Sequence, residues 1–395
     1  MLRTTSDRTA ILSFDFPLSR AAAWSRLEAF VAQAGATYAE RRNFDAGPGR
    51  HDAVSRLSPA LRRRLISEEE VARAVIERHG REAASKFLSE LFWRTYWKGW
   101  LEQRPSVWAD WRHACQMLHE AGAPAGYAAA IEGRTGIDAF DGWVRELCET
   151  GYLHNWARMQ LASIWIFTLG LPWELGAEFT FAKLLDADPA SNTLSWRWVA
   201  GLHTAGKAYL ANAENINVRT GGRFRPDGLA MVADVPRGTE APERSALRMP
   251  TDPSQRPALL LLTPEDLSLE TEGPLQRLDV RRVVACRAHC QRPADIAAVA
   301  DGLQRAAAHW RVGSVWLDDL DAVAALARES GCEQVVTGYA AVGPVRDSFR
   351  KMAQCEGVHF TEHRRAWDAR AWPQCGKGYF AFAKHIAELL TAAGM

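Results

Sequence analysis

The segment LLDADPASNTLSWRW, residues 184–198, gathers side chains that can do chemistry. Asp186 and Asp188 carry carboxylates that can bind a metal ion or accept hydrogen bonds, and Asn192 has an amide that can donate and accept. The indoles of Trp196 and Trp198 can fill a core, stack on a planar ligand or carry an electron. The segment alone leaves a metal site and a ligand site open.

Tryptophan is unusually frequent in this chain. There are 16 tryptophans among 395 residues, and most precede residue 200. A large indole with an N–H that needs a partner is costly to place in a core. The cluster therefore favours stacking on a planar ligand, or electron transfer, over core filling.

Length and composition indicate a folded protein of two domains. The chain is 47% hydrophobic and 24% charged, as is typical of globular proteins. Its net charge of +1 points neither to nucleic acid nor to an acidic substrate. The segment RLSPALRRRL at 56–65 predicts either a local basic surface for phosphate groups or a solvated helix face.

Several site classes and compartments are disfavoured. No apolar run reaches the roughly 18 residues that span a bilayer, and the N-terminus lacks the apolar core of a signal peptide. We therefore expect a cytoplasmic protein without a membrane contact.

The seven cysteines are scattered, which predicts free thiols. The motif CRAHC at 286–290 lacks a second ligand pair at a zinc-like spacing, so we expect no metal.

The spacing of apolar residues predicts that the chain is helical up to residue 232 and changes character after it. The clearest helical patterns lie at 19–42, 67–80, 81–103, 137–151 and 153–171.

Residues 233–257 have the proline-rich, polar composition of a linker. Beyond them, short apolar β-branched runs alternate with helical patterns, which predicts a Rossmann-like α/β domain with a parallel sheet. No GxGxxG or P-loop motif specifies a nucleotide there. The expected division is a helical domain at 1–232, the linker, and an α/β domain at 258–395.

Several segments together resemble the flavin-binding domain of the cryptochrome/photolyase family. FLSELFWRTYW at 87–97 resembles its E-L-x-W-R helix, and TGIDAFDGWVRELCETGYLHNWARM at 135–159 resembles its T-G…G-W-M-H-N-x-x-R-M block. Residues 184–206 resemble its D-G-D-x-x-x-N…W-x-W block. YAERRNF at 38–44 with SRLSPAL at 55–61 resembles its phosphate-binding stretch. The resemblance implies an all-helical domain that binds FAD in a U shape.

The resemblance also assigns contacts to FAD. Tyr38, Ser55, Leu57 and Ser58 fall where the family holds the pyrophosphate near a helix start, which favours anions. Arg94 would add charge-assisted hydrogen bonds to the phosphates. Arg158 would pair with Asp186, and Asn192 would face flavin N5, where an amide influences which redox state persists. The full expected set is Tyr38, Val54, Ser55, Arg56, Leu57, Ser58, Phe87, Glu90, Arg94, Asn155, Arg158, Asp186, Asp188 and Asn192.

A second set matches the lesion pocket of pyrimidine-dimer photolyases: Glu90, Trp93, Asn155 and Met159. The resemblance implies that Trp93 stacks on a flipped dimer and Glu90 bonds a base edge. From the residues alone, a solvated or core position on an amphipathic helix is the alternative. Trp198 is either a pocket or a core aromatic.

Two tryptophans match the family's electron-transfer chain. Trp196 corresponds to the member next to the flavin and Trp173 to the middle member. The surface member, expected near Glu120, is not a tryptophan. The candidate replacements are Trp108, Trp111 and, as a branch of the chain, Trp165.

Four positions depart from the family pattern. Val54 replaces a threonine, Phe87 a tryptophan, Trp156 an arginine and Thr193 a second asparagine. These changes bear on dimer repair more than on FAD binding.

The order of the domains is also unusual, because family members place an α/β antenna domain before the helical one. Residues 258–270, 346–363 and 375–386 resemble segments of that antenna domain, which predicts a permuted chain. The arginine pair of its opening turn is replaced by TPED, so an antenna chromophore stays open, as does an unrelated α/β domain.

We therefore expect a monomeric blue-light FAD flavoprotein, a photolyase-type lyase, that repairs cyclobutane pyrimidine dimers in UV-damaged DNA by electron transfer from reduced FAD. The alternative is a cryptochrome-like photoreceptor that signals through a protein partner without repair. A third interpretation is a flavin-binding scaffold in which light has no role.

Overall fold

The computed structural model describes residues 16–204, 207–236, 242–352 and 358–395. Four sequence features lie wholly or partly outside these residues: the N-terminal residues 1–15, the end of the 184–206 block, the middle of the linker, and part of the 346–363 segment with Cys355. Within the described residues, no helix is long and apolar enough to cross a membrane.

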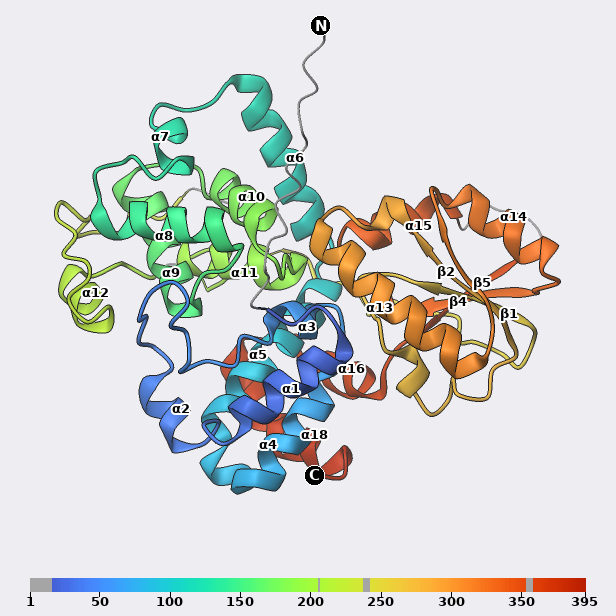
Figure 1. The fold of residues 1–395 in the computed structure, drawn as a ribbon. Coiled ribbons are helices and arrows are strands. Elements are labelled where there is room, and N and C mark those ends of the chain that lie inside the picture. Colours follow the sequence, from blue (N-terminus) through green and yellow to red (C-terminus); the bar gives the residue numbers. More distant parts are fainter. Residues whose placement is uncertain (1–15, 205–206, 237–241, 353–357) are drawn as a thin grey trace, which may run out of the picture.

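The first half of the chain is helical, as predicted (Figure 1). Its helices are α1 (Arg20–Val31), α2 (Ala36–Arg41), α3 (Ser58–Arg62), α4 (Glu68–Ala83), α5 (Ser85–Glu102), α6 (Ser106–Ala121), α7 (Tyr127–Ile131), α8 (Asp138–Thr150), α9 (Asn155–Ser163), the π-helical turn η1 (Ile164–Thr168), α10 (Trp173–Lys183), α11 (Pro189–Val199) and α12 (Ala213–Arg219).

Local sequence explains several of these boundaries. Ser67 and Glu70 form a capping box that starts α4, and Gly80, at a φ of 73°, kinks it. Gly151 ends α8 in the left-handed conformation. Asp188 caps α11, and Pro189 takes the first position of that helix, where its missing N–H costs nothing.

The second half contains the predicted parallel sheet, with strand order β3-β2-β1-β4-β5. Side chains of alternate β1 residues point to opposite faces of the sheet, and each face packs on a different layer of helices. Leu260 packs with α13 in the large core, and Leu259 packs with α14 and α15 in a smaller one. The strands are β1 (Ala258–Leu262), β2 (Val280–Cys286), β3 (Ser314–Leu317), β4 (Gln334–Gly338) and β5 (His359–His363), and the helices are α13 (Pro293–Trp310), α14 (Asp321–Glu329) and α15 (Pro344–Met352).

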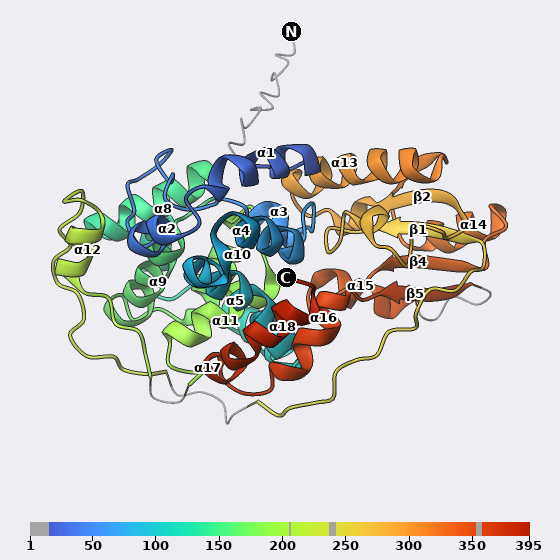
Figure 2. The same cartoon turned by 90° about the horizontal axis from the view of Figure 1, so that it is seen from below.

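The last helices return to the helical half and pack on α5 (Figure 2). Trp367 stacks on Phe92 with ring centroids 4.9 Å apart and donates from Nε1 to Thr95 Oγ1 over 2.9 Å. A Cβ on Gly99 would lie 2.7 Å from Cys375 Sγ, so glycine permits this close approach. These elements are α16 (Ala366–Ala371), η4 (Trp372–Gln374), α17 (Tyr379–Phe382), η5 (Ala383–His385) and α18 (Ile386–Ala392). The predicted domain boundaries, with a linker at 233–257 between domains at 1–232 and 258–395, stay predictions.

The described part of the linker runs along the outside of the molecule toward β1 (Figure 2). It is tied down at several points. Arg244 Nε donates to Gln103 Oε1 over 2.6 Å, and the Ser254 N–H donates to Gln334 Oε1 over 3.1 Å. The segment therefore acts as a strap that contacts both halves.

Three consecutive arginines at the end of α3 join the halves, and we call them the arginine triplet. Arg62 Nη2 lies 2.6 Å from Glu265 Oε1, and Arg63 Nη2 lies 2.6 Å from Asp295 Oδ1. Arg64 forms ion pairs with Asp368 and, at 3.6 Å, with Asp266. All three side chains are buried. The predicted basic surface at 56–65 is therefore wrong for these residues, because carboxylates of the α/β half cover them.

Burial makes these pairs obligatory. Removal from water lowers the pKa of Arg63, and the Asp295 carboxylate opposes this shift. An unpaired buried charge is strongly destabilising. The triplet can therefore stay buried only while the two halves are in contact and supply its carboxylate partners.

The same contacts fill the place where open α/β sheets bind ligands, beyond the carboxyl ends of strands at the point where strand order reverses. In this sheet that point lies between β1 and β4. Glu265 and Asp266 follow β1 and bind the triplet. Tyr339 follows β4 and donates its hydroxyl to buried Glu102 of α5 over 2.6 Å.

We expect Asp295→Ala to lower the free energy of unfolding by about 3–5 kcal/mol, because it leaves Arg63 buried without its partner. Asp279→Ala is the matched control, since it breaks the exposed Asp279–Arg281 pair, and it should cost at most about 1 kcal/mol. Urea unfolding measures both. Equal losses would contradict the role given to the triplet.

Candidate functional site

A cavity of about 590 Å³ opens in the helical half, within the size range of small-molecule sites. Its wall comes from α2, the segment before α3, and helices α5, α9, α10 and α11. The predicted site residues that line it are Tyr38, Val54, Ser55, Arg56, Leu57, Ser58, Glu90, Trp93, Arg94, Asn155, Arg158, Met159, Asp186, Asp188, Asn192, Trp196 and Trp198.

Asp188 is held as an anion in the cavity wall. Its carboxylate accepts from the Ser191 N–H over 2.8 Å and lies 2.7 Å from Arg94 Nη1. Burial alone would raise its pKa, but Arg94, Lys98 and Arg62 together lower it to about 2. One member of the arginine triplet thus acts on this cavity.

Asp186 pairs with Arg158, as the sequence predicts, with Nη1 and Oδ2 3.1 Å apart. Burial opposes its ionisation, yet Arg158 and Arg94 hold its pKa below the ordinary value. Since each aspartate already has an arginine partner, the pair offers polar contacts to an organic ligand more readily than a site for a cation.

Asn192 has a fixed orientation. Its Nδ2 donates to the Ala177 carbonyl over 2.8 Å, and its Oδ1 accepts from Thr180 Oγ1 over 2.9 Å. Trp196 Nε1 donates to the same Thr180 hydroxyl over 2.9 Å. The amide keeps one N–H and one lone pair for a ligand. Sequence reasoning missed Thr180, because nothing in its local pattern marks it as the link between Asn192 and Trp196.

The predicted lesion-pocket residues Glu90, Trp93, Asn155 and Met159 all line this cavity. Glu90 Oε1 lies 2.7 Å from Arg42 Nη1, a cavity residue that sequence reasoning also missed. Burial raises the pKa of Glu90, and Arg42 opposes the shift. Trp93 and Trp97 meet at 5.0 Å between ring centroids, so two indoles stand side by side in the wall.

Phe87 and Trp173 lie outside the lining, as do the candidate replacements Trp108, Trp111 and Trp165. Phe87 packs between Phe30 and Tyr38, at 5.6 and 5.2 Å between centroids, and so supports Tyr38 from behind. Trp173 is buried with the Arg197 guanidinium 5.8 Å from its ring. Their expected roles in FAD binding and electron transfer stay predictions.

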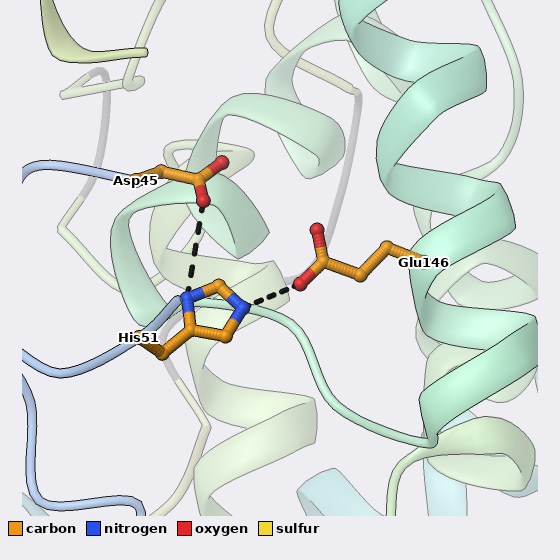
Figure 3. A group of neighbouring side chains, drawn as sticks. All are labelled: Asp45, His51 and Glu146. Carbon is orange, nitrogen blue, oxygen red and sulfur yellow. Dashed lines mark hydrogen bonds and ion pairs between the residues drawn. The ribbon is translucent and has the colours of Figure 1, made fainter. Parts of the chain in front are cut away.

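Outside the cavity lining, Asp45, His51 and Glu146 form a buried group (Figure 3). His51 Nε2 lies 2.5 Å from Glu146 Oε1, and its Nδ1 lies 3.9 Å from Asp45 Oδ1. Asp45 is also bound by Trp143 Nε1 and by Arg223, each at 2.9 Å. The imidazole thus lies between two carboxylates instead of converging with them on one point. This arrangement holds the segment before α3 against α8.

Residues 87–257 match the FAD binding domain of DNA photolyase. This match identifies the helical half as an FAD-binding domain of the photolyase type. The deoxyribodipyrimidine photo-lyase of Escherichia coli is 30% identical over 209 residues, which are 50% of this chain and 43% of that protein. The enzyme of the same name from Thermus thermophilus is 37% identical over 187 residues, 46% of this chain and 42% of the relative. The chain thus spans less than half the length of these relatives.

Among solved structures, a class III photolyase from Agrobacterium tumefaciens is similar, with a TM-score of 0.46 and 29% identity over 56% of this chain and 46% of that one. The cofactor of the helical half is FAD. The cavity itself also fits FAD, because its size, its arginines and its serine hydroxyls suit a ligand with phosphates and a planar ring.

Buried histidines beside the site predict a pH dependence. Burial lowers the pKa of His154 and of His203 from 6.5 to about 4. Both are therefore neutral in the folded chain, while the unfolded chain takes up protons below about pH 6.5. The contribution of these two histidines to the free energy of unfolding is complete above that pH and falls as the pH drops toward 4.

We expect the urea midpoint to be lower at about pH 5 than at about pH 7.5, and His203→Asn to reduce this difference. His113→Asn is the control, since His113 is exposed, and it should leave the difference unchanged. A midpoint that stays constant across this range would contradict the buried neutral histidines.

Proposed function

We propose that this protein repairs cyclobutane pyrimidine dimers in UV-damaged DNA with blue light. The observation that carries the proposal is that Glu90, Trp93, Asn155 and Met159 share one cavity with the expected FAD contacts. A flipped pyrimidine in contact with the first set would lie beside the cofactor. The name of the relatives, deoxyribodipyrimidine photo-lyase, supports the same reaction.

When bound, reduced FAD supplies the light-excited electron that opens the dimer, and the residues of the chain bind and orient the substrate. Trp93 offers an aromatic face for stacking. Glu90, with Arg42 favouring its ionised form, accepts an N–H from a base edge. Arg94 and Arg158 keep the two cavity aspartates ionised.

The direct test is to illuminate the reduced holoprotein with an oligonucleotide that contains a thymine dimer. Wild type should restore thymines only under light. Glu90→Ala should lower affinity for the dimer by about tenfold or more, because a charged hydrogen bond is lost.

Glu388→Ala, at an exposed glutamate of α18, should leave both repair and affinity unchanged. If wild type binds FAD and is photoreduced but repairs nothing, the photolyase proposal fails, and the cryptochrome-like photoreceptor becomes the better account.

We also propose an electron path that leaves the cavity through Trp196, Trp165 and Tyr127. Trp196 and Trp165 meet at 6.0 Å between ring centroids, and Trp165 and Tyr127 at 5.9 Å. A Cβ on Gly176 would lie 2.4 Å from the Trp196 ring, so this glycine permits the approach. Tyr127 is partly exposed, which gives the path an end at the surface.

The family position of Trp173 makes it the competing second step. The Arg197 guanidinium 5.8 Å from the Trp173 ring disfavours the positive charge that an oxidised indole would carry. Trp165 Nε1 instead donates to the Pro172 carbonyl over 2.8 Å.

We expect Trp165→Phe to slow light-driven reduction of the bound flavin more than Trp173→Phe does, and Trp196→Phe to slow it most. Absorbance of the flavin under blue light with an external thiol measures all three. Slower reduction in Trp173→Phe than in Trp165→Phe would assign the second step to Trp173 instead.

A further inference from the structure

The C-terminal segment of the α/β half reaches the wall of the proposed dimer pocket. Tyr379, the first residue of α17, stacks on Trp93 of α5 with ring centroids 3.5 Å apart and planes inclined by only 9°. The two residues are far apart in the chain, and α17 lies beside α5 in the fold (Figure 2).

The position of the Tyr379 ring is fixed from α5 itself. Its hydroxyl donates to the Ser89 carbonyl over 2.6 Å and lies 2.9 Å from Ser89 Oγ. The turn before it is held as well, because the Tyr96 hydroxyl donates to the Lys377 carbonyl over 2.9 Å and Arg104 Nη2 to the Gly376 carbonyl over 2.8 Å. Hydrogen bonds at both ends of the turn therefore hold the ring against Trp93.

Tyr379 stands behind Trp93 and not in the cavity. Trp93 and Trp97 line the cavity, whereas the buried Tyr379 is not among the described residues of its lining. Trp93 thus contacts both the cavity and the phenol of Tyr379. One side of the indole is covered by the phenol, and the indole still presents surface to a ligand.

We propose that Tyr379 is a positioning residue that holds the indole of Trp93 in the orientation needed to stack on a flipped pyrimidine. This inference rests on the proposed function. An unsupported indole in a cavity wall would have rotamer freedom to lose when a base stacks on it. A second ring stacked behind it removes that freedom in advance, and preorganisation of this kind increases affinity.

The inference also gives the α/β half a part in substrate binding. Its C-terminal turn supplies one layer of the pocket wall, and the helical half supplies the layer that meets the substrate.

The test measures binding in the dark of the holoprotein to two oligonucleotides, one with a thymine dimer and one undamaged. Tyr379→Leu removes the supporting ring and should lower the preference for the dimer about two- to tenfold. Tyr379→Phe keeps the ring and should retain most of the preference. The flavin spectrum should be unchanged in both variants, since Tyr379 does not line the cavity.

Phe382→Leu is the matched control for general loosening of the segment. Phe382 belongs to the same short helix and packs on Phe92, Tyr96 and Tyr379, at 6.1, 5.6 and 6.0 Å between centroids. The change therefore loosens the same segment but keeps the ring that stacks on Trp93. This variant should leave the preference for the dimer close to that of wild type.

A double-mutant cycle separates positioning from simple packing. In a Trp93→Leu background there is no indole to orient, so adding Tyr379→Leu should change the preference for the dimer by less than about twofold. A loss in Tyr379→Leu that is equally large in the Trp93→Leu background would overturn the inference.

Two outcomes distinguish this inference from the proposed function. If wild type shows no preference for the dimer, the proposed function has failed and the inference fails with it. If wild type prefers the dimer and Tyr379→Leu prefers it equally, the proposed function stands and the positioning role is rejected.

Discussion

The structure depends on the arginine triplet, residues 62–64, whose charges are buried between the two halves of the chain. Each guanidinium has a carboxylate partner in the α/β half. An unpaired charge in this position would be strongly unfavourable, so the halves must stay docked. Helix α3, at whose C-terminal end the triplet lies, also brings Ser58 to the cavity. One short helix therefore fixes the domain contact and one wall of the FAD cavity.

This contact connects two features that lie far apart in the sequence, the TPED turn and the arginine triplet. The TPED turn stands where the resemblance to an antenna domain leads one to expect an arginine pair, and its Glu265 and Asp266 bind Arg62 and Arg64. Arg365 then bonds Asp266 through two nitrogens, each at 2.7 Å. The ligand-binding end of the sheet is thus filled by ion pairs within the chain. The permuted order of the halves itself stays a prediction.

Sequence reasoning succeeded where the signal is local. Periodicity predicted the helices and the parallel sheet, and four linked motifs predicted half of the residues that line the cavity. It failed where a residue's role depends on a distant partner. The charge of Arg63 is plain in the sequence, but its burial follows from Asp295 in α13. Tyr379 gives no local sign that it stacks on Trp93, and Thr180 becomes meaningful only when α10 packs on α11.

The central claim is that the buried ion pairs make the two halves one cooperative unit around the FAD cavity. Urea unfolding of the holoprotein tests it most directly, with flavin fluorescence to follow release of the cofactor and far-UV circular dichroism to follow loss of structure. We predict that both signals change at the same urea concentration. A circular-dichroism transition at lower urea, with the flavin still bound, would show that the α/β half unfolds alone and would contradict this account.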